Sequence, residues 1–438
     1  MTYPDALNNI HSLLAFGSRP GLDRIRELLY RMNNPQDKLR FVHVAGTNGK
    51  GSTCAMISAV LRKAGYKTGL FISPYITDFR ERIQINNIPV SEETLLHTVK
   101  KTFPLVEQLR SEGIVITEFE YVNALEFYIH AEANCDVVVL EAGMGGLLDC
   151  TNVIAPPLCA VITSIGLDHT TVLGETIEAI ATQKCGILKL GSLAVTSAQD
   201  VGAMRVIEAT AAKRRIPLMK SETIKTDIRE ISLRGSRFLY REKEIFLPLA
   251  GDHQIENAKT ALATLEALRT NQLLQISDEA IAAGMQEAVN PARLELLCDE
   301  PIVLLDGAHN PNGIEALKAA LKRFLPDTPI ICVMGMLADK DIDSVITLLD
   351  DVFERVFTVP VNNPRSLSAE ELAKKFERHT KTVRPFASCE EAYDAAFELA
   401  ICTNNAILIC GSLYLAGEIR PYIHYKSSLP RDASIAFA

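Results

Sequence analysis

The stretch AGTNGKGST, residues 45–53, follows the short apolar run FVHV and precedes a long segment of helical periodicity. Glycine permits a sharp backbone turn and lets backbone N–H groups approach a ligand closely. Lys50 adds a point charge suited to phosphate oxygens. A helix beginning at Ser52 would direct its positive end at the same place. The order of strand, glycine-rich loop and helix therefore predicts a phosphate-binding loop.

This stretch departs from the general pattern G-x-x-x-x-G-K-[ST] at two places. Val44 stands where the first glycine is expected, and Gly51 separates Lys50 from Ser52. A serine or threonine hydroxyl at the end of such a loop binds magnesium. The alternative is an ordinary glycine-rich connection between a strand and a helix, which the surrounding pattern disfavours.

The overall composition is that of a globular protein. The chain has 438 residues, of which 47% are hydrophobic and 23% charged, and this length allows two or three domains. The net charge of −9 argues against a nucleic-acid-binding surface, which requires a basic domain or stripe. An acidic protein can still bind phosphate through a local nest of N–H groups.

The cysteines and the apolar runs bear on the cellular compartment. Ten cysteines are scattered without a C-x-x-C pair, so a zinc or redox motif is not indicated. We expect reduced thiols in a cytoplasmic protein. No signal peptide is visible, and no apolar run approaches ~18 residues, so we expect no membrane span.

Short apolar runs alternate with helical segments along most of the chain. FVHVAG, KTGLFIS, CDVVVLEAG and CAVITSIG read as buried strands, and STCAMISAVLRKAGY reads as a helix. This alternation predicts an α/β fold in which helices cover both faces of a mostly parallel sheet. Residues 230–249 instead resemble antiparallel hairpin material, inserted before the helix HQIENAKTALATLEALR.

The segment AVNPARLELL, residues 288–297, carries a proline and ends the helical period, so we interpret it as an interdomain hinge. Beyond it, PIVLLDGAHN, PIICVMGML, RVFTVPV and AILICG read as strands. We therefore predict two α/β domains. Residues 1–292 form a P-loop-type domain with the antiparallel insertion, and residues 293–438 form a smaller Rossmann-like domain.

The loop GTNGKGST closely resembles the nucleotide loop of folylpolyglutamate synthases and dihydrofolate synthases, in the Mur ligase superfamily, where the extra glycine before the serine is typical. The resemblance continues in order through FISPYITDFRERIQIN, LEAGMGGLLDCTN, TSIGLDHTTVLGETIEAIATQKCGILK, GDHQIENAKTALATLE, PARLE, LLDGAHNP, GMLADKD and GSLYLAGEIR. Nine such motifs in order cover nearly the whole chain and identify it as a member of this family.

The resemblance implies an ATP-dependent carbon–nitrogen ligase that adds L-glutamate to folates. The γ-phosphate of ATP activates a carboxylate as an acyl phosphate, which the amine of glutamate attacks. Such chemistry needs Mg²⁺ and cations around the transferred phosphoryl group and positive charge near the later oxyanion. The expected partners are ATP, L-glutamate and a folate or dihydropteroate, with no nucleic acid and no membrane, and we expect a monomer.

The phosphate and metal ligands are implied by matching motifs. The resemblance implies that ATP is bound by the loop residues Thr47, Asn48, Gly49, Lys50, Gly51 and Ser52. The ligands implied for two magnesium sites are Ser52, Ser73, Glu141 and His169. Carboxylate is the ligand that magnesium prefers, whereas imidazole is unusual for it, and manganese can substitute. The alternatives are a solvated strand-end charge for Glu141, a plain loop serine for Ser73 and a structural histidine for His169.

Lys184, in TQKCGILK, aligns with a lysine that many family members carry as a carbamate, which would place an anion near the metals. Gln183 and Cys185 stand where the family usually has Glu and Ala. The alternative is an unmodified lysine in an ion pair. The catalytic candidates that the resemblance implies are Lys50, His169, Lys184 and His309.

The resemblance implies that residues from the second half of the chain contact the nucleotide from its other side. The amide of Asn257 can hydrogen-bond a base edge, and Arg293 and Asp306 would close on the nucleotide from the hinge and the second domain. A hinge ion pair is the alternative for Arg293. A site divided in this way predicts domain closure that excludes water from the acyl phosphate.

The pterin site is implied in the first domain. The matching positions are Gly21, Leu22, Asp23, Thr117, Phe119, Leu148, Asp149 and Cys150. Phe79, Arg80 and Arg82 are candidates for holding the pterin or the glutamate tail. Leu147 stands where family members often have Arg, so we expect one charged contact to be missing.

Other functions stay open at the level of sequence. A nucleotide-dependent switch would hydrolyse ATP under the control of a protein partner, and the second α/β domain argues against it. A muramyl peptide ligase usually carries a further N-terminal domain, for which the loop near residue 46 leaves no room. A small-molecule kinase would not need glutamate. Within the family, a dedicated polyglutamate synthase without dihydropteroate activity is the alternative to a bifunctional enzyme.

Overall fold

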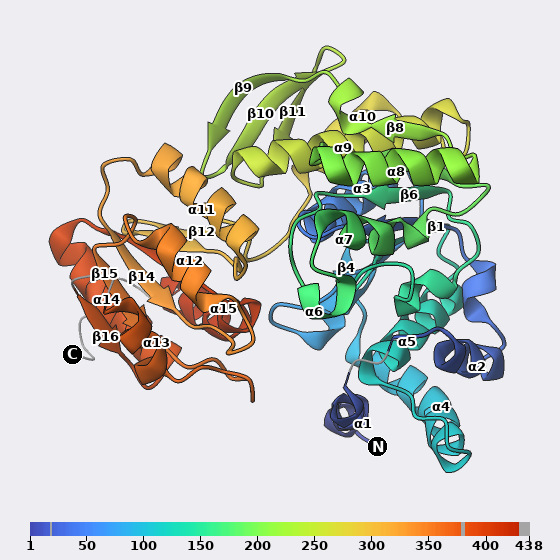
Figure 1. Ribbon diagram of the computed structural model, residues 1–438, viewed down its shortest axis with the longest axis horizontal. Coiled ribbons are helices and arrows are strands. Elements are labelled where there is room, and N and C mark those ends of the chain that lie inside the picture. Colours follow the sequence, from blue (N-terminus) through green and yellow to red (C-terminus); the bar gives the residue numbers. More distant parts are fainter. Residues whose placement is uncertain (18–19, 378–381, 429–438) are drawn as a thin grey trace.

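The computed structural model describes residues 1–17, 20–377 and 382–428. Two sheets form the centres of two lobes that lie side by side (Figure 1). The first sheet has eight strands and the second has six, and a three-stranded sheet accompanies the first. The predicted α/β fold with mostly parallel sheets is confirmed. No helix of the described residues has the length and apolar character needed to cross a membrane.

The eight-stranded sheet has the order β4-β3-β2-β5-β1-β6-β7-β8. The neighbours β2, β5, β1, β6, β7 and β8 pair in parallel, whereas β3 is antiparallel to both β2 and β4. Strand β1 lies in the middle, between β5 and β6, so the loop after β1 leaves from the centre of the sheet. The strands are β1 (Phe41–Ala45), β2 (Thr68–Phe71), β3 (Ile83–Ile85), β4 (Ile88–Pro89), β5 (Val137–Glu141), β6 (Cys159–Ile162), β7 (Leu193–Thr196) and β8 (Leu218–Lys220).

Both faces of this sheet are buried, which explains its continuous apolar runs. Val137 and Val139 pack into one core, whereas Val138 and Leu140 pack into the core on the opposite face. The first core lies under α3 (Lys50–Lys63), α9 (Asp252–Thr270) and α10 (Asp278–Gln286). The opposite face is covered by α1 (Tyr3–Ser12), α2 (Asp23–Arg31), α4 (Glu92–Ser111), α5 (Glu118–Glu132), α7 (Ile177–Lys184) and α8 (Val201–Arg214), and the short α6 (Thr170–Leu173) precedes α7.

Helix α3 begins at Lys50, two residues before the predicted start at Ser52. Gly49 has a φ of 83° and occupies the N-cap position, so the chain turns into the helix immediately after it. The positive end of α3 therefore belongs to the glycine-rich loop itself.

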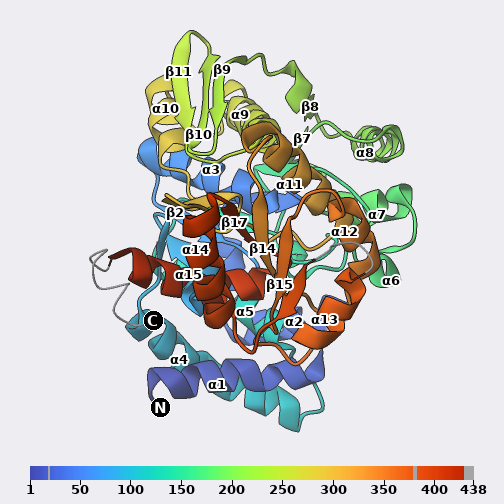
Figure 2. The same cartoon turned by 90° about the vertical axis from the view of Figure 1, so that its left-hand side faces the viewer.

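The predicted antiparallel insertion is confirmed and contains three strands, one more than a hairpin. These are β9 (Asp227–Ser232), β10 (Gly235–Tyr240) and β11 (Lys243–Leu247). Their apolar side chains, including Phe238 and Leu247, join the core beneath α3 and α9. Figure 2 shows this small sheet projecting at one end of the molecule, next to α9 and α10.

The six-stranded sheet has the order β12-β13-β17-β14-β15-β16, with β12 antiparallel to β13 and the other pairs parallel. The four strands predicted in this part of the chain are confirmed. The strands are β12 (Glu295–Asp299), β13 (Ile302–Leu305), β14 (Ile330–Met334), β15 (Arg355–Thr358), β16 (Val383–Pro385) and β17 (Ala406–Cys410). Helices α11 (Pro311–Phe324), α12 (Ile342–Leu349) and α13 (Ala369–Phe376) cover one face, and α14 (Cys389–Thr403) and α15 (Leu413–Ser428) cover the other.

The segment interpreted as a hinge connects α10 to this second sheet. Its last three residues, 295–297, already belong to β12, so the connection is shorter than predicted. The boundary between residues 292 and 293 stays a prediction.

Candidate functional site

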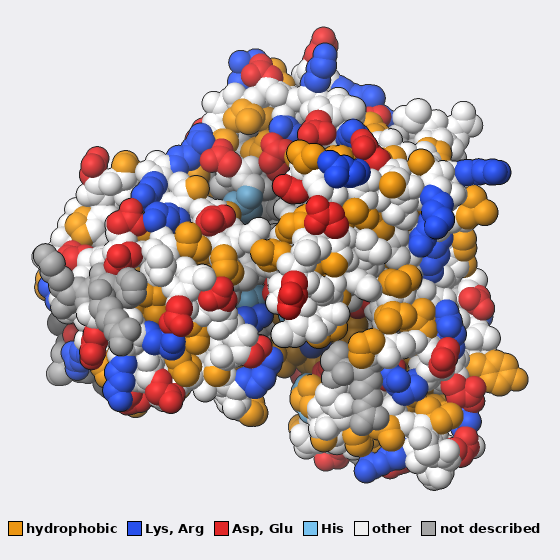
Figure 3. Space-filling view, viewed as in Figure 1, with side chains coloured by type: hydrophobic (Ala, Val, Ile, Leu, Met, Phe, Trp, Pro, Cys, Tyr) orange, Lys and Arg blue, Asp and Glu red, His pale blue; other side chains and the backbone are white. Residues whose placement is uncertain are grey.

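A cavity of about 500 Å³ lies between the two lobes. Because the carboxyl ends of parallel strands meet at one edge of a sheet, the loops after β1, β2, β5 and β6 all reach it. The second lobe contributes the loop after β13 and the start of α11. Figure 3 shows histidine side chains in the crevice between the lobes.

Two glycines let the loop after β1 approach its neighbours. A Cβ atom on Gly46 would lie 1.8 Å from Oγ1 of Thr163. A Cβ atom on Gly49 would lie 2.2 Å from Oδ1 of Asn257, and its φ of 83° is one that side chains rarely adopt. Gly46 and Gly49 are thus required by close packing against the residue that follows β6 and against α9.

The backbone of Thr47 and Asn48 is already engaged. Both N–H groups donate to the carbonyl of Ser164, at 2.8 and 3.2 Å. The donors left for an anion are the N–H of Gly49, which has no backbone acceptor among the described residues, and those of the first turn of α3, from Lys50 to Ser52, which have no acceptor within the helix. The predicted phosphate site is therefore the helix start, and Thr47 and Asn48 shape the loop around it.

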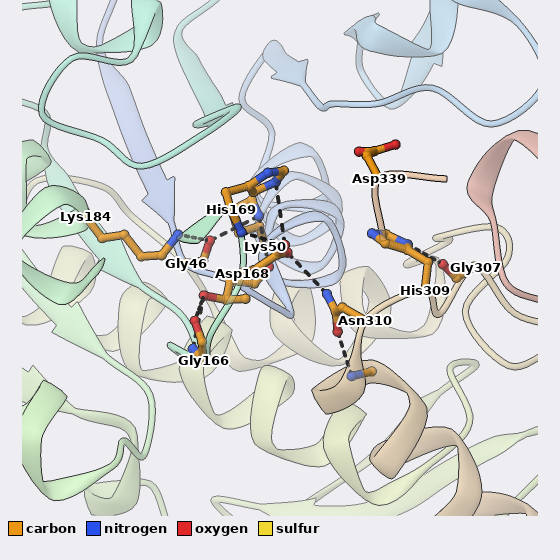
Figure 4. A network of polar contacts seen from close by, with 12 residues as sticks. Gly46, Lys50, Gly166, Asp168, His169, Lys184, Gly307, His309, Asn310 and Asp339 are labelled. Carbon is orange, nitrogen blue, oxygen red and sulfur yellow. Dashed lines mark hydrogen bonds and ion pairs between the residues drawn. The ribbon is translucent and has the colours of Figure 1, made fainter. Parts of the chain in front are cut away.

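Two lysines converge on this loop (Figure 4). Nζ of Lys50 donates to the carbonyls of Gly46 and Thr47, both at 3.1 Å. Nζ of Lys184 donates to the carbonyl of Gly46 at 2.7 Å. Burial, and then the charge of Lys50, lower the pKa of Lys184 to about 7. Lys184 forms no ion pair within residues 1–17, 20–377 and 382–428, so the structure does not support the ion-pair alternative.

Three oxygen donors lie beside the start of α3. Ser52 and Glu141 are 3% and 4% exposed, and both line the cavity together with Ser73. Oε2 of Glu141 accepts a hydrogen bond from the backbone N–H of Ser73 at 3.1 Å. Burial raises the pKa of Glu141, and the charge of Lys50 opposes this shift. Carboxylate and hydroxyl oxygens are hard ligands, so this donor set fits magnesium.

His169 differs from these three residues. Its φ is 50°, and its side chain is 47% exposed at the mouth of the cavity. Nε2 lies 3.9 Å from Oδ1 of Asp168. Burial lowers the pKa of His169, while Asp168 opposes the shift. The imidazole is therefore neutral near pH 7 and can act as a ligand.

The loop after β13 brings the second lobe to the same cavity. Asp306 is 8% exposed and accepts hydrogen bonds from the N–H groups of Leu294 and Ala308, both at 2.7 Å. Nδ1 of His309 donates to the carbonyl of Gly307 at 2.8 Å, which leaves Nε2 as an acceptor. Burial, with Lys340 contributing in the same direction, lowers the pKa of His309 to about 4.

Arg293 lines the cavity from the connection between the lobes. It forms no ion pair with any residue in the described part of the chain. Burial raises the pKa of Asp306, and the charge of Arg293 opposes this shift. The hinge ion pair that was the alternative for Arg293 is therefore not found among the described residues.

Three residues of the cavity region were not predicted from the sequence. Asp168 accepts a hydrogen bond from Nδ2 of Asn310 at 3.2 Å, which joins the two lobes across the cavity (Figure 4). Nδ2 of Asn290 donates to Oγ of Ser52 at 2.9 Å. Asp168 and Asn310 stand next to predicted histidines in LDHT and GAHN, which was the available signal. Asn290 carried no local signal.

The implied pterin residues do not line this cavity. Thr117 caps α5, and a Cβ atom on Gly143 would lie 2.4 Å from the ring of Phe119. Asp149 accepts hydrogen bonds from the N–H groups of Met144 and Thr151, at 2.8 and 3.0 Å. Cys150 is buried, Leu148 is 47% exposed, and Gly21, Leu22 and Asp23 lie at the start of α2.

The loop after β2 connects the two groups of residues. Phe79 and Arg82 are buried in it, and the guanidinium of Arg82 lies over the rings of Phe79 and Tyr75. Nη1 of Arg82 is 3.5 Å from Oγ of Ser73, which lines the cavity. Arg80 instead pairs with Asp78.

Comparison with known proteins places this two-lobed architecture in a family of ligases. Residues 44–265 match the family described as Mur ligase middle domain, and residues 292–413 match Mur ligase, glutamate ligase domain. The chain belongs to the Mur ligase family and, within it, to the group of dihydrofolate synthases and folylpolyglutamate synthases.

Individual relatives cover almost the whole chain. Dihydrofolate synthase/folylpolyglutamate synthase of Bacillus subtilis is 38% identical over 95% of this chain and 98% of its own length. Folylpolyglutamate synthase of Lacticaseibacillus casei is 35% identical over 96% and 98%. The structure of Mycobacterium tuberculosis folylpolyglutamate synthase complexed with ADP and AMPPCP matches with a TM-score of 0.87 at 31% identity, over 96% of this chain and 99% of that one.

Proposed function

We propose that the protein is an ATP-dependent ligase that adds L-glutamate to the carboxylate of a folate and also to that of dihydropteroate. The observation that carries the proposal is one cavity in which a phosphate loop, a hydroxyl–carboxylate donor set and a loop of the second lobe meet. The names of the relatives support the choice of substrates. The alternative is a dedicated polyglutamate synthase, the activity named for the Lacticaseibacillus casei relative.

In this proposal the first turn of α3 and Lys50 bind the triphosphate, and the start of α9 and Arg293 with Asp306 close on the rest of ATP. Ser52, Ser73 and Glu141 would hold magnesium, and His169 would complete a second metal site in which manganese can substitute. Magnesium there would neutralise charge on the transferred phosphoryl group. The donor set supports this assignment because its oxygens match the preference of the ion.

The proposed reaction has two steps. A carboxylate oxygen of the folate attacks the γ-phosphorus, the bond to the bridging oxygen breaks, and ADP leaves. The neutral amine of glutamate then attacks the acyl carbon, a C–N bond forms, and inorganic phosphate leaves while the nitrogen loses a proton. Lys50 stabilises the charge that develops on the phosphoryl oxygens.

His309 has a limited role in this scheme. A pKa of about 4 makes it a weak base near neutral pH. We assign its Nε2 to accepting a hydrogen bond from the incoming amine, which orients the nucleophile. Closure of the second lobe would hold water away from the acyl phosphate.

Lys184 is proposed to carry a carbamate. Its pKa of about 7 leaves much of the amine neutral at physiological pH, and only the neutral amine attacks CO₂. The C–N bond that forms releases one proton and replaces a cation by an anion. Nζ retains one hydrogen, so the bond to the carbonyl of Gly46 is compatible with the modification.

The same proposal covers the pterin site, the two domains, the oligomeric state and the cellular location. The residues around α2, the start of α5 and the loop after β5 are assigned to the pterin, with Phe79 and Arg82 towards the tail. We assign residues 1–292 and 293–438 to two domains of a monomer in the cytoplasm. All ten cysteines are free thiols, the state that a reducing compartment maintains.

The deciding experiment is glutamate-dependent release of ADP and phosphate, with dihydropteroate and tetrahydrofolate in parallel and products identified by mass. Activity with both substrates supports the bifunctional enzyme. Activity with tetrahydrofolate alone would establish the dedicated polyglutamate synthase. No dependence on glutamate with either would overturn the ligase and favour a nucleotide switch. Lys50→Ala serves as the inactive control, provided that its circular dichroism spectrum matches the wild type.

A further inference from the structure

A hydrogen bond joins the connection between the lobes to the phosphate loop. Nδ2 of Asn290 donates to Oγ of Ser52 at 2.9 Å, although 238 residues separate them in the chain. A Cβ atom on Gly51 would lie 3.5 Å from Nδ2 of Asn290 and 3.7 Å from Oε2 of Glu141. The amide of Asn290 therefore lies over the first turn of α3, on the side of the proposed metal ligands.

This bond constrains the hydroxyl of Ser52. A serine hydroxyl has one proton and two lone pairs. The amide occupies one lone pair, which leaves the second for a cation and the proton for a phosphate oxygen. Ser52 is 3% exposed, so few alternative partners from solvent compete for it. A ligand group oriented before binding loses less rotational freedom when the cation arrives.

The position of Asn290 in the chain adds a second constraint. From Ala292 onward the connection is held by the second lobe, since the N–H of Ala292 donates to Glu295 at 2.9 Å and Glu295 pairs with Arg420 of α15 at 2.7 Å. Ala292 and Leu294 have φ values of 55° and 48°, in a region that favours glycine. Asn290 is thus held by the first lobe, immediately before a conformationally restricted segment held by the second.

We propose that Asn290 is a positioning residue whose amide orients Ser52 for the magnesium ion of the bound nucleotide. Because the same residue ends the part of the connection that is attached to the first lobe, magnesium at Ser52 and the orientation of the lobes are coupled through it. The inference rests on the proposed function, in which Ser52 is a magnesium ligand.

The test is the affinity for AMPPCP, measured by calorimetry with magnesium and with EDTA. In Asn290→Ala we expect unchanged affinity in EDTA. The increase in AMPPCP affinity that magnesium produces should be about 3- to 10-fold smaller than in the wild type, which corresponds to the free energy of one neutral hydrogen bond. Ser52→Ala should remove more of this gain. Adding Asn290→Ala to Ser52→Ala should then have no further effect, as expected for residues that act through one another.

A matched control is Val289→Ala, an exposed neighbour at 67% exposure that should leave all affinities unchanged. Small-angle scattering gives a second readout: Asn290→Ala should need more magnesium than the wild type for the same compaction with AMPPCP. An unchanged magnesium gain in Asn290→Ala, or additive losses in the double variant, would overturn the inference alone. A wild-type affinity that ignores magnesium would overturn both this inference and the proposed metal site.

Discussion

At the scale of single residues, the environment of a side chain decides what its chemistry can be. Lys184 and Lys50 both donate to the carbonyl of Gly46, but Lys184 is buried whereas Lys50 is only partly buried, and burial lowers the pKa of Lys184 to about 7. An ammonium group loses its hydration when it is buried, and this favours the neutral amine. The sequence shows two lysines, and burial distinguishes them.

We expect the activity to depend on bicarbonate, and we expect the size of this dependence to change with pH. The folded pKa of Lys184 lies below its usual value, so the amine is mostly charged below pH 7 and mostly neutral above it. Removing CO₂ should reduce the rate, and bicarbonate should restore it more completely at pH 8 than at pH 6.5. Steady-state rates in degassed buffer measure this effect.

Lys184→Ala is the control for the bicarbonate response. It should be less active, and bicarbonate should not change its rate. A wild-type rate that does not respond to CO₂ at either pH would contradict the carbamate.

His169 provides a second prediction at this scale. If it is a metal ligand, His169→Ala should raise the magnesium concentration for half-maximal activity by about tenfold or more, since even outer-shell partners of metals typically contribute that much. A magnesium titration at saturating ATP measures the shift. His97→Ala, an exposed histidine on α4, should not change it. Equal magnesium requirements in wild type and His169→Ala would remove this residue from the site.

At the scale of elements, α15 of the second lobe contacts the loop after β2 directly. A Cβ atom on Gly417 would lie 1.8 Å from the carbonyl oxygen of Ile76, and Ile76 packs against the core of the second lobe. The carboxylate of Glu81 accepts hydrogen bonds from the N–H groups of Ile76, Thr77 and Asp78 and so holds this part of the loop. The same loop carries Ser73, so α15 contacts the loop that contributes one residue to the proposed metal site.

Gly417→Ala should destabilise the protein by about 1–3 kcal/mol, because the new methyl group meets backbone that no rotamer change can move away. Urea unfolding measures the change. The sign is diagnostic, since alanine in place of glycine inside an ordinary helix stabilises by roughly 1 kcal/mol. A stabilised variant would show that α15 does not press against the loop.

At the scale of the whole molecule, few polar contacts join the lobes around the cavity. Asp168 and Asn310 meet across it, and Arg323 pairs with Asp252 near the start of α9 at 2.7 Å. The second pair is largely exposed, at 47% and 60%, so it adds little to stability. A nucleotide bound between the lobes would therefore contribute much of the free energy of interaction between them.

Magnesium–AMPPCP at one hundred times its dissociation constant should stabilise the wild type by about 2.7 kcal/mol, which appears as a higher Tm in calorimetry. At the same ligand concentration Arg293→Ala should show a smaller shift, because it removes the cation that we propose to contact the nucleotide from this side of the cavity. Arg323→Ala should keep the full shift. A full shift in Arg293→Ala would mean that the connection does not contact the nucleotide.

Much of the architecture was readable from the chain. The run CDVVVLE became β5, with Glu141 at its end, because a strand buried on both faces requires consecutive apolar residues. The glycine-rich loop, the antiparallel insertion and four of the six strands of the second sheet were predicted for similar local reasons. The enzyme family and the α/β fold are confirmed, whereas the roles of the site residues and the domain boundary stay predictions.

Other features depended on contacts that no local pattern records. The start of α3 at Lys50 follows from the left-handed Gly49, and the approach of Asn257 from α9 leaves no space for a side chain at this position. The pairing of Asn290 with Ser52 arises only when the chain returns to its first lobe before entering the second.

The sequence by itself determined which segments alternate in and out of the sheets and which residue types stand at the strand ends. Tertiary structure alone decided that Lys184 is buried beside Gly46 and that Asp168 faces Asn310. The physical reason is one of range. Periodicity and backbone preference act between neighbours in the chain, whereas burial, pKa shifts and contacts across the cavity depend on which distant segments the packed core brings together.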